Sequence, residues 1–268
     1  MRAWWRWAGL VAIGIVTTAS AQIAGPGVPA PFAAMDDPLT RGLSAPDRAQ
    51  FEKAAATDLR RLDATAARLQ PQRPGVVDAY VISIALDSDP VFGREAREAG
   101  RVLARRYDAE GRTLVLAGPD GRAIDPLPRG TQATLGAALA RVAAVIDKHE
   151  DALILYVTAH GTPQGIVWRN RGDILATITP GALENQLRRL GLSNRLLILS
   201  ACFSGIFAPV LASPEGAVIT AAAADRTSFG CAADNDWTFF GDALINHALR
   251  KPQPLAAAFV EARGTVAG

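Results

Sequence analysis

ALILYVTAHG at residues 152–161 and RLLILSACFSG at residues 195–205 share one pattern, an apolar run that passes into a short turn of small and polar residues. Both runs are aliphatic without polar alternation, which is typical of parallel strands that are buried on both faces. His160 ends the first run, and Cys202 ends the second. Because α/β sheets build their sites at the carboxyl ends of parallel strands, these two side chains are the candidate reactive groups.

The spacing between His160 and Cys202 is 42 residues. A strand–helix–strand crossover needs about 30 residues or more, so the two strands can be parallel neighbours. Their ends would then bring the imidazole within hydrogen-bond reach of the thiol, where it helps to generate the reactive thiolate. Ser204 is a poorer candidate nucleophile, because the Gly-x-Ser-x-Gly elbow of serine hydrolases is absent.

Several segments together carry a family resemblance. Residues 157–167 contain His160 and a Gly-Ile-Val hairpin, residues 200–205 read Ser-Ala-Cys-Phe-Ser-Gly, and residues 219–231 are followed by Thr-Phe-Phe-Gly-Asp at 238–242. In order and spacing these segments resemble the legumain-type cysteine peptidases, which belong to one structural clan with the caspases. The resemblance covers Val76 to the C-terminus. It implies a caspase-like α/β sandwich of three layers, with a mainly parallel sheet and helices on both faces.

The resemblance also implies roles for individual residues. Cys202 and His160 would form a catalytic dyad that hydrolyses peptide bonds through an acyl-enzyme, and the backbone amides of Gly161 and Cys202 would form the oxyanion hole. A glycine at 161 would let the substrate backbone approach that amide closely. Legumain-type enzymes cut after Asn and sometimes Asp. Four residues match the substrate pocket in this chain, although legumains carry an acid at the first of them: Ser200, Ser228, Asp242 and, more loosely, Arg94.

The chain organisation predicts one catalytic domain at residues 76–268, after a lead-in segment at 22–75 that contains one amphipathic helix. Strand and helix patterns alternate through the domain, as in a parallel sheet covered by helices. The expected strands are 76–86, 113–117, 152–159, 195–201 and 217–221. The expected helices are 47–69, 94–106, 131–149, 180–190, 237–249 and 254–262.

The N-terminus, Met1 to Ala21, has the layout of a secretory signal peptide: two arginines, an apolar stretch and an Ala-Ser-Ala cleavage site. Its removal would leave 26 basic against 26 acidic residues. A neutral mature chain argues against a nucleic-acid partner. We therefore expect an exported protein, periplasmic or secreted, which has no stable membrane insertion after cleavage and acts on peptides or proteins.

Two alternatives share part of this pattern. A transamidase or peptide ligase of the same family would use the same residues, with an amine in place of water. A non-catalytic binding domain could instead hold a Cys202–Cys231 disulfide, because an oxidising compartment favours such bonds. No cofactor is expected, since no Gly-rich phosphate loop follows the first strand, and no metal is expected, since no His or Cys pair has ligand spacing.

Overall fold

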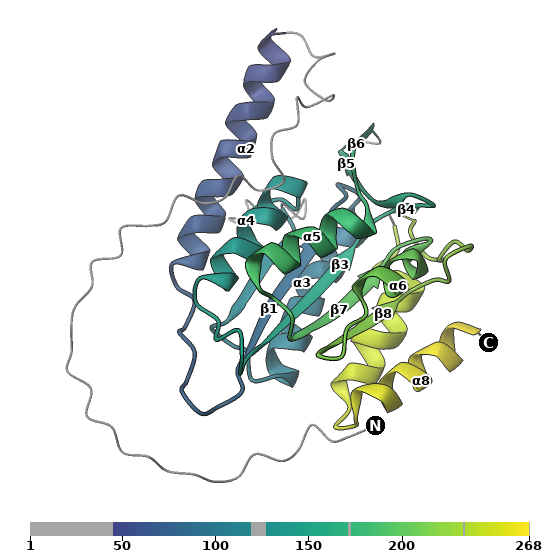
Figure 1. The fold of residues 1–268 in the computed structure, drawn as a ribbon. Helices are drawn as coiled ribbons and strands as arrows, with labels where there is room; N and C mark the ends of the chain where they lie inside the picture. The colour runs from purple at the N-terminus through teal and green to yellow at the C-terminus, as the bar shows by residue number, and fades with distance from the viewer. Residues whose placement is uncertain (1–44, 119–126, 171–172, 233, 268) are drawn as a thin grey trace, which may run out of the picture.

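A five-stranded sheet forms the centre of the protein in a computed structural model, which describes residues 45–118, 127–170, 173–232 and 234–267 (Figure 1). The strand order is β2-β1-β3-β7-β8, and every neighbouring pair is parallel. The strands are β1 (Ala79–Ala85), β2 (Thr113–Leu116), β3 (Ala152–Thr158), β7 (Arg195–Ser200) and β8 (Gly216–Thr220). All five were predicted from the sequence, to within three residues at each end.

The two faces of the sheet bury different side chains of the same strands. On β3, Leu153, Leu155 and Val157 belong to one apolar cluster, whereas Ile154 and Tyr156 belong to another. This alternation is why an unbroken apolar run forms a strand here, since both faces are covered. The polar residues among these strands therefore need partners inside the protein.

Helices cover both faces, which confirms the three-layer architecture. The face that contains Leu155 is covered by α2 (Ala45–Ala66), α4 (Gln132–Ala143), α5 (Pro180–Leu190), the 3-10 helix η1 (Ser204–Phe207) and α6 (Ala208–Leu211). The opposite face is covered by α3 (Pro90–Arg106), α7 (Phe239–Gly241), the π-helix η2 (Asp242–His247), the 3-10 helix η3 (Ala248–Arg250) and α8 (Leu255–Ala267). Figure 1 shows the sheet between these two layers.

A second, antiparallel sheet lies beside the carboxyl edge of the main one. Its strands are β4 (Gly161–Thr162), β5 (Gly165–Asn170) and β6 (Asp173–Ile178). The amide of Arg169 donates to the carbonyl of Leu86, 3.0 Å away. The backbones of Arg169 and Asp87 form an isolated parallel β-bridge. The hairpin that follows His160 is thereby fastened to the end of β1. The sequence indicated the hairpin but not the strand β6.

The helix predicted at 47–69 is α2, and it packs against the domain. Leu62 is fully buried in the main core cluster, and Asp58 binds the backbone and side chain of Arg129. The predicted signal peptide at 1–21 and the first part of the lead-in, 22–44, lie outside the described residues. Within the described ranges, no helix has the length and apolarity that a membrane crossing requires.

Candidate active site

The two candidate reactive residues follow adjacent parallel strands at the same level. β3 and β7 pair with Thr158 opposite Ser200, and the amide of Ala159 donates to the carbonyl of Ser200 at 3.1 Å. His160 and Cys202 each come two residues after this matched pair. The structure therefore brings them to the same edge of the sheet, as the sequence predicted.

Gly161 packs directly against the nucleophile segment. A Cβ atom added at Gly161 would lie 2.0 Å from the carbonyl oxygen of Cys202, far inside contact distance. The structure thus gives a nearer reason for this glycine than room for a substrate: the two strand ends need it to come together. The amides of Gly161 and Cys202 stay a predicted oxyanion hole.

The sulfur of Cys202 contacts three atoms of Ser228. The Ser228 amide donates to Sγ at 3.2 Å, and its hydroxyl lies 3.4 Å from the same atom. The carbonyl oxygen of Ser228 lies 3.7 Å from the same sulfur, so one residue places a donor and an acceptor beside it. The turn after Cys202 is sharp, because Phe203 has a φ of +56° and its amide donates to the carbonyl of Arg226 at 2.8 Å.

Ser204 is not placed as a nucleophile. Its side chain is fully buried, and its hydroxyl accepts hydrogen bonds from the amides of Ala221 at 3.1 Å and Ala222 at 3.3 Å. These bonds fasten the turn after Cys202 to the end of β8. Ser204 therefore fixes the geometry around the thiol.

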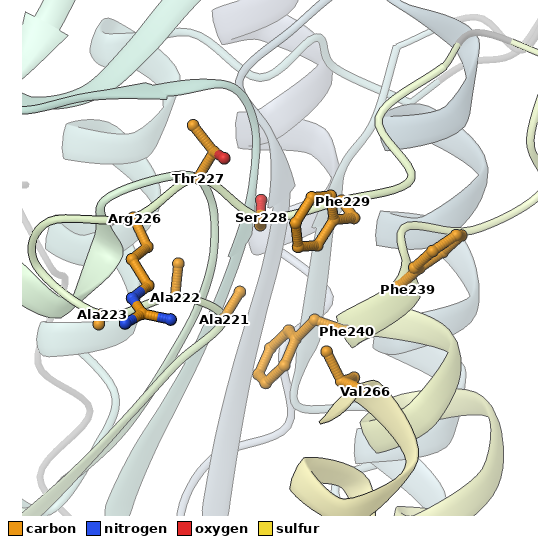
Figure 2. A pocket seen from close by; sticks show the side chains of 10 residues that line it. All are labelled: Ala221, Ala222, Ala223, Arg226, Thr227, Ser228, Phe229, Phe239, Phe240 and Val266. Atoms are coloured by element: carbon orange, nitrogen blue, oxygen red, sulfur yellow. The ribbon is translucent and has the colours of Figure 1, made fainter. Parts of the chain in front are cut away.

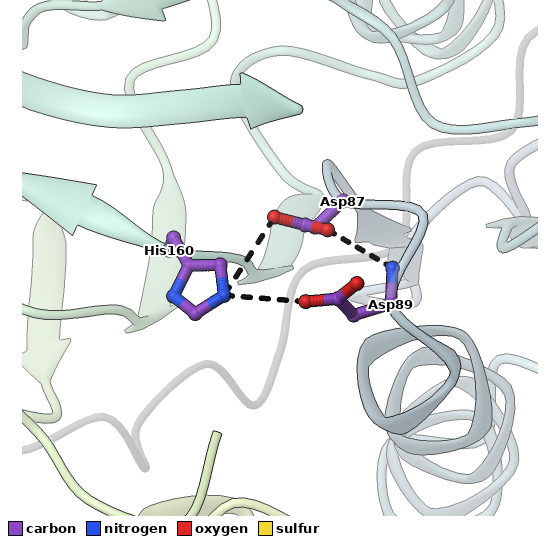
Figure 3. Close-up of side chains that lie close together, drawn as sticks. All are labelled: Asp87, Asp89 and His160. Atoms are coloured by element: carbon purple, nitrogen blue, oxygen red, sulfur yellow. Dashed lines mark hydrogen bonds and ion pairs between the residues drawn. The ribbon is translucent and has the colours of Figure 1, made fainter. Parts of the chain in front are cut away.

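Two carboxylates, drawn in Figure 3, and one aromatic ring contact the imidazole of His160. Its Nε2 lies 3.5 Å from Oδ2 of Asp89 and 3.9 Å from Oδ2 of Asp87. The ring of Phe92 meets it edge to face, with centroids 5.0 Å apart. In Figure 3 the other nitrogen, Nδ1, points away from both carboxylates. Nδ1 is thus the ring nitrogen that can exchange a proton with a group other than these two carboxylates.

Asp87 is the buried member of this group. Its side chain is 0% exposed, Oδ1 accepts from the amide of Asp89 at 2.9 Å, and Oδ2 has no hydrogen-bond partner. Burial raises the pKa of Asp87, although the amide of Asp89 and the charges of His160 and Arg169 act in the opposite direction. A guanidinium nitrogen of Arg169 lies 3.6 Å from Oδ2. Two acids therefore share two basic side chains.

Donor atoms of Asp87, Asp89 and His160 all lie within 4.8 Å of one another, so these three residues could hold a divalent cation. Arg169 already places a positive charge beside the same carboxylates. The guanidinium of Arg169 therefore balances negative charge on Asp87 and Asp89 without a metal ion. Spacing of His and Cys pairs did not predict this cluster, because two of its three residues are aspartates.

The two aspartates were missed although a signal was present. They lie in Asp87-Ser-Asp89-Pro90, directly after the apolar run predicted as the first strand. β1 lies next to β3, so its carboxyl end meets the end that carries His160. The rule that selected His160 and Cys202 therefore also selects Asp87 and Asp89.

A buried polar network lies beneath the site. Glu95 of α3 is fully buried; it accepts from the hydroxyl of Tyr156 at 2.5 Å and from the amide of Thr238 at 2.7 Å. The hydroxyls of Ser200 and Thr238 lie 3.2 Å apart. Burial raises the pKa of Glu95, and burial with the Glu95 carboxylate raises the pKa of Tyr156 well above its ordinary value. This network holds the start of α7 against the ends of β3 and β7.

The predicted pocket residues are placed differently from one another. Ser228 touches the sulfur, whereas Ser200 is only 2% exposed and bonded within the buried network. Arg94 donates to the backbone at residue 235 and pairs with the carboxylate at 236, 3.5 Å away. Asp242 contacts the asparagine and histidine four and five residues further along its own helix. Ser228 is thus the predicted pocket residue for which the described contacts include the sulfur.

Cys231 lies close to the site, but its surroundings do not favour a reactive thiol. Both cysteines are free thiols, so the Cys202–Cys231 disulfide considered above is not present. Burial, with the neighbouring Cys202 as a smaller cause, raises the pKa of Cys231 to about 11. A thiol with such a pKa stays protonated at neutral pH and is a poor nucleophile.

Comparison with known proteins agrees with this geometry. The family model described as the Peptidase C13 family matches residues 129–267, about half of the chain, and this span contains both His160 and Cys202. A search of curated proteins gives no match. The fold is the one that the legumain resemblance implied, an all-parallel sheet between two helical layers. The chain belongs to the Peptidase C13 family, the legumain family of cysteine peptidases.

Proposed function

We propose that this protein is an exported cysteine endopeptidase in which Cys202 is the nucleophile and His160 transfers the proton. The observation that carries the proposal is the matched register of β3 and β7, which sets both residues at one edge of the sheet. The amide of Ser228 at the sulfur and the two carboxylates at Nε2 of His160 support it. These contacts orient the two side chains that the chemistry needs.

The proposed reaction starts with proton transfer within the dyad. Asp87 and Asp89 favour a proton on Nε2 of His160, so the lone pair on Nδ1 is free to accept the proton of the Cys202 thiol. The thiolate attacks the peptide carbonyl carbon and forms a C–S bond. The resulting oxyanion is held by the amides of Gly161 and Cys202. The imidazolium then protonates the amine as the C–N bond breaks, and water hydrolyses the acyl-enzyme.

Location and cleavage preference are part of the same proposal. Cleavage after Ala21 would release a mature protein of neutral formal charge outside the cytoplasm. The family resemblance supports Asn or Asp as the cleaved residue, with Ser228 beside the nucleophile as the pocket residue that reads it. Ser200 stands where legumains carry an acid, and its hydroxyl is bonded to Thr238 in this chain.

The test exposes a proteome-derived peptide library to the mature protein under mild reductant, and new termini are read by mass spectrometry. Cys202→Ala and His160→Ala should each abolish the new termini while both variants stay folded. Cys231→Ala is the matched control, since it removes the other thiol, and it should cleave as the wild type does. New termini that persist in Cys202→Ala would refute the assignment.

One added reagent separates hydrolysis from transfer. With a peptide that offers a free N-terminal amine present, a hydrolase yields mostly free carboxyl termini, because water outcompetes an unactivated amine at the acyl-enzyme. A transamidase yields mainly the amine adduct. We expect free carboxyl termini, and predominant adducts would make transamidation the better account.

A further inference from the structure

An apolar groove runs from the nucleophile to the C-terminal helix. It consists of two adjoining cavities of about 180 and 280 Å³, which share Ala221–Ala223, Phe240 and Val266. The smaller cavity is also lined by Ser228, whose hydroxyl lies 3.4 Å from the sulfur of Cys202. The groove therefore opens beside the proposed reacting centre and continues past α7 to α8.

Alanine and phenylalanine side chains form much of the groove wall, as Figure 2 shows for the smaller cavity. Phe229 and Phe239 are 63% and 56% exposed, and no other phenylalanine is exposed within the described part of the chain. The amide of Phe239 donates to the carbonyl of Phe229 at 3.2 Å, so the two segments that carry these rings are joined. Exposed aromatic surface of this kind marks a binding site.

The floor of the groove is rigid. The amide of Ala221 donates to the carbonyl of Leu199 and, like the amide of Ala222, to the buried hydroxyl of Ser204. Each side chain on this floor is a single methyl group, which leaves room above it. A preformed apolar pocket with little to reorganise is suited to binding an apolar side chain.

The charged side chains that line the groove are both arginines. Arg226 lines it near Ser228, Arg263 lines it near the C-terminus, and no acidic residue is among the lining residues of either cavity. The side chain of Arg226 is 80% exposed at the rim, and its Nε lies 4.0 Å from the carboxylate of Asp225. A lysine or arginine entering the groove would lose its water and find no acidic partner among the lining residues. An apolar side chain would meet neither cost.

We infer that this groove binds an apolar side chain of the peptide substrate, such as leucine or phenylalanine, within three residues of the scissile bond. An extended peptide advances about 3.3 Å per residue, so a groove that starts at Ser228 is reached within a few residues. A cavity of about 150 Å³ holds a benzene ring, and the smaller cavity has about 180 Å³. The inference rests on the proposed peptidase function and adds a substrate class to it.

The first experiment uses synthetic peptides built around one cleaved sequence. Each of the three positions on either side of the scissile bond carries in turn leucine, phenylalanine, asparagine or lysine. We expect one position at which leucine or phenylalanine raises kcat/KM by at least about tenfold over lysine, because a buried apolar side chain contributes about 1.5–3 kcal/mol.

Two variants and one control locate this preference in the groove. Val266→Arg adds a cation to the groove, and Phe239→Ser removes an exposed wall; both should abolish most of the apolar preference. Val260→Arg is the matched control, because Val260 lies on the same helix, is 63% exposed and does not line either cavity. It should leave the preference unchanged. Using two groove variants keeps the test valid if one of them misfolds.

Binding of the same peptides to Cys202→Ala protein, measured by fluorescence anisotropy, separates the two claims. Cys202-dependent cleavage without an apolar preference, or with one that both groove variants retain, overturns the groove and leaves the peptidase standing. Absence of cleavage together with tighter binding of apolar peptides, lost on Val266→Arg, supports the groove and refutes the peptidase. Absence of both cleavage and selective binding overturns both.

Discussion

Asp89 presents Oδ2 to Nε2 of His160 at 3.5 Å, on the side of the ring opposite Nδ1 (Figure 3). Asp89→Asn would replace a carboxylate with an amide that cannot hold the imidazole in the same way. We expect kcat to fall by about 10- to 100-fold with little change in KM, since substrate contacts are untouched. Steady-state kinetics on one good peptide measures both constants. A rise in KM at constant kcat would show that Asp89 binds substrate instead.

Gly161→Ala tests the contact between the two strand ends. The new methyl group would lie 2.0 Å from the carbonyl oxygen of Cys202, so one strand end must move. Because a displacement of about 1 Å costs about 100-fold in rate, we expect activity to fall by at least that factor. Gly181→Ala is the control, since nothing lies within 4 Å of a Cβ there, and it should retain activity and melting temperature. Equal activity in both variants would contradict the tight contact.

Residues at strand ends were predictable because an apolar run and its last residue are visible in the sequence. This held for His160 and Cys202, and the same rule would have found Asp87. The hydrogen-bond partner of the Ser200 hydroxyl was not predictable. Ser200 is buried as the last residue of β7, but its hydroxyl lies 3.2 Å from that of Thr238, which is 38 residues further along the chain and belongs to a different element. A contact of that kind follows from packing and leaves no local pattern.

At the scale of elements, Glu95 joins α3 to β3 and to the start of α7. Burial raises the pKa of Glu95, so the folded protein holds a proton at pH values where an unfolded glutamate has lost it. Between the ordinary and the raised pKa, the free energy of unfolding therefore falls as pH rises. Glu95→Gln cannot ionise, and we expect it to remove this slope. Urea denaturation at several pH values measures it.

Glu98 on the same helix provides the opposite control for this prediction. Burial acts to raise the pKa of Glu98, but hydrogen bonds from Arg250 and Arg101 lower this pKa below its ordinary value. Its stabilising contribution is therefore present above the ordinary pKa of glutamate and is lost as pH falls through the lowered value. Glu98→Gln should change the acidic side of the stability profile only. If Glu95→Gln keeps the wild-type slope, Glu95 does not carry the proton.

The elements themselves followed from the sequence where periodicity was strong. The five parallel strands were found, and α5 was placed with its exact bounds, between Thr179 as N-cap and the left-handed Gly191. Strand β6 was missed because its pairing with β5 shifts register between Trp168 and Arg169, and its pattern is short. The segment 237–249 was expected as one helix, but residues 239–250 pass from α through π to 3-10 geometry. Hydrogen-bond register of this kind does not show in side-chain periodicity.

At the scale of the whole molecule, α2 lies before the predicted catalytic domain in sequence but shares its core. Leu62 is 0% exposed among residues of β1 and α4, and Arg141 of α4 reaches Asp63 at 2.9 Å. Leu62→Ala should lower the free energy of unfolding by about 2–5 kcal/mol, the cost of a cavity in a packed core. Lys53→Ala, on the exposed side of the same helix, should change it little. Chemical denaturation followed by circular dichroism measures both variants. If Leu62→Ala unfolds like the wild type, α2 is docked without contributing to the cooperative unit, and the domain begins at Val76 as the sequence predicted.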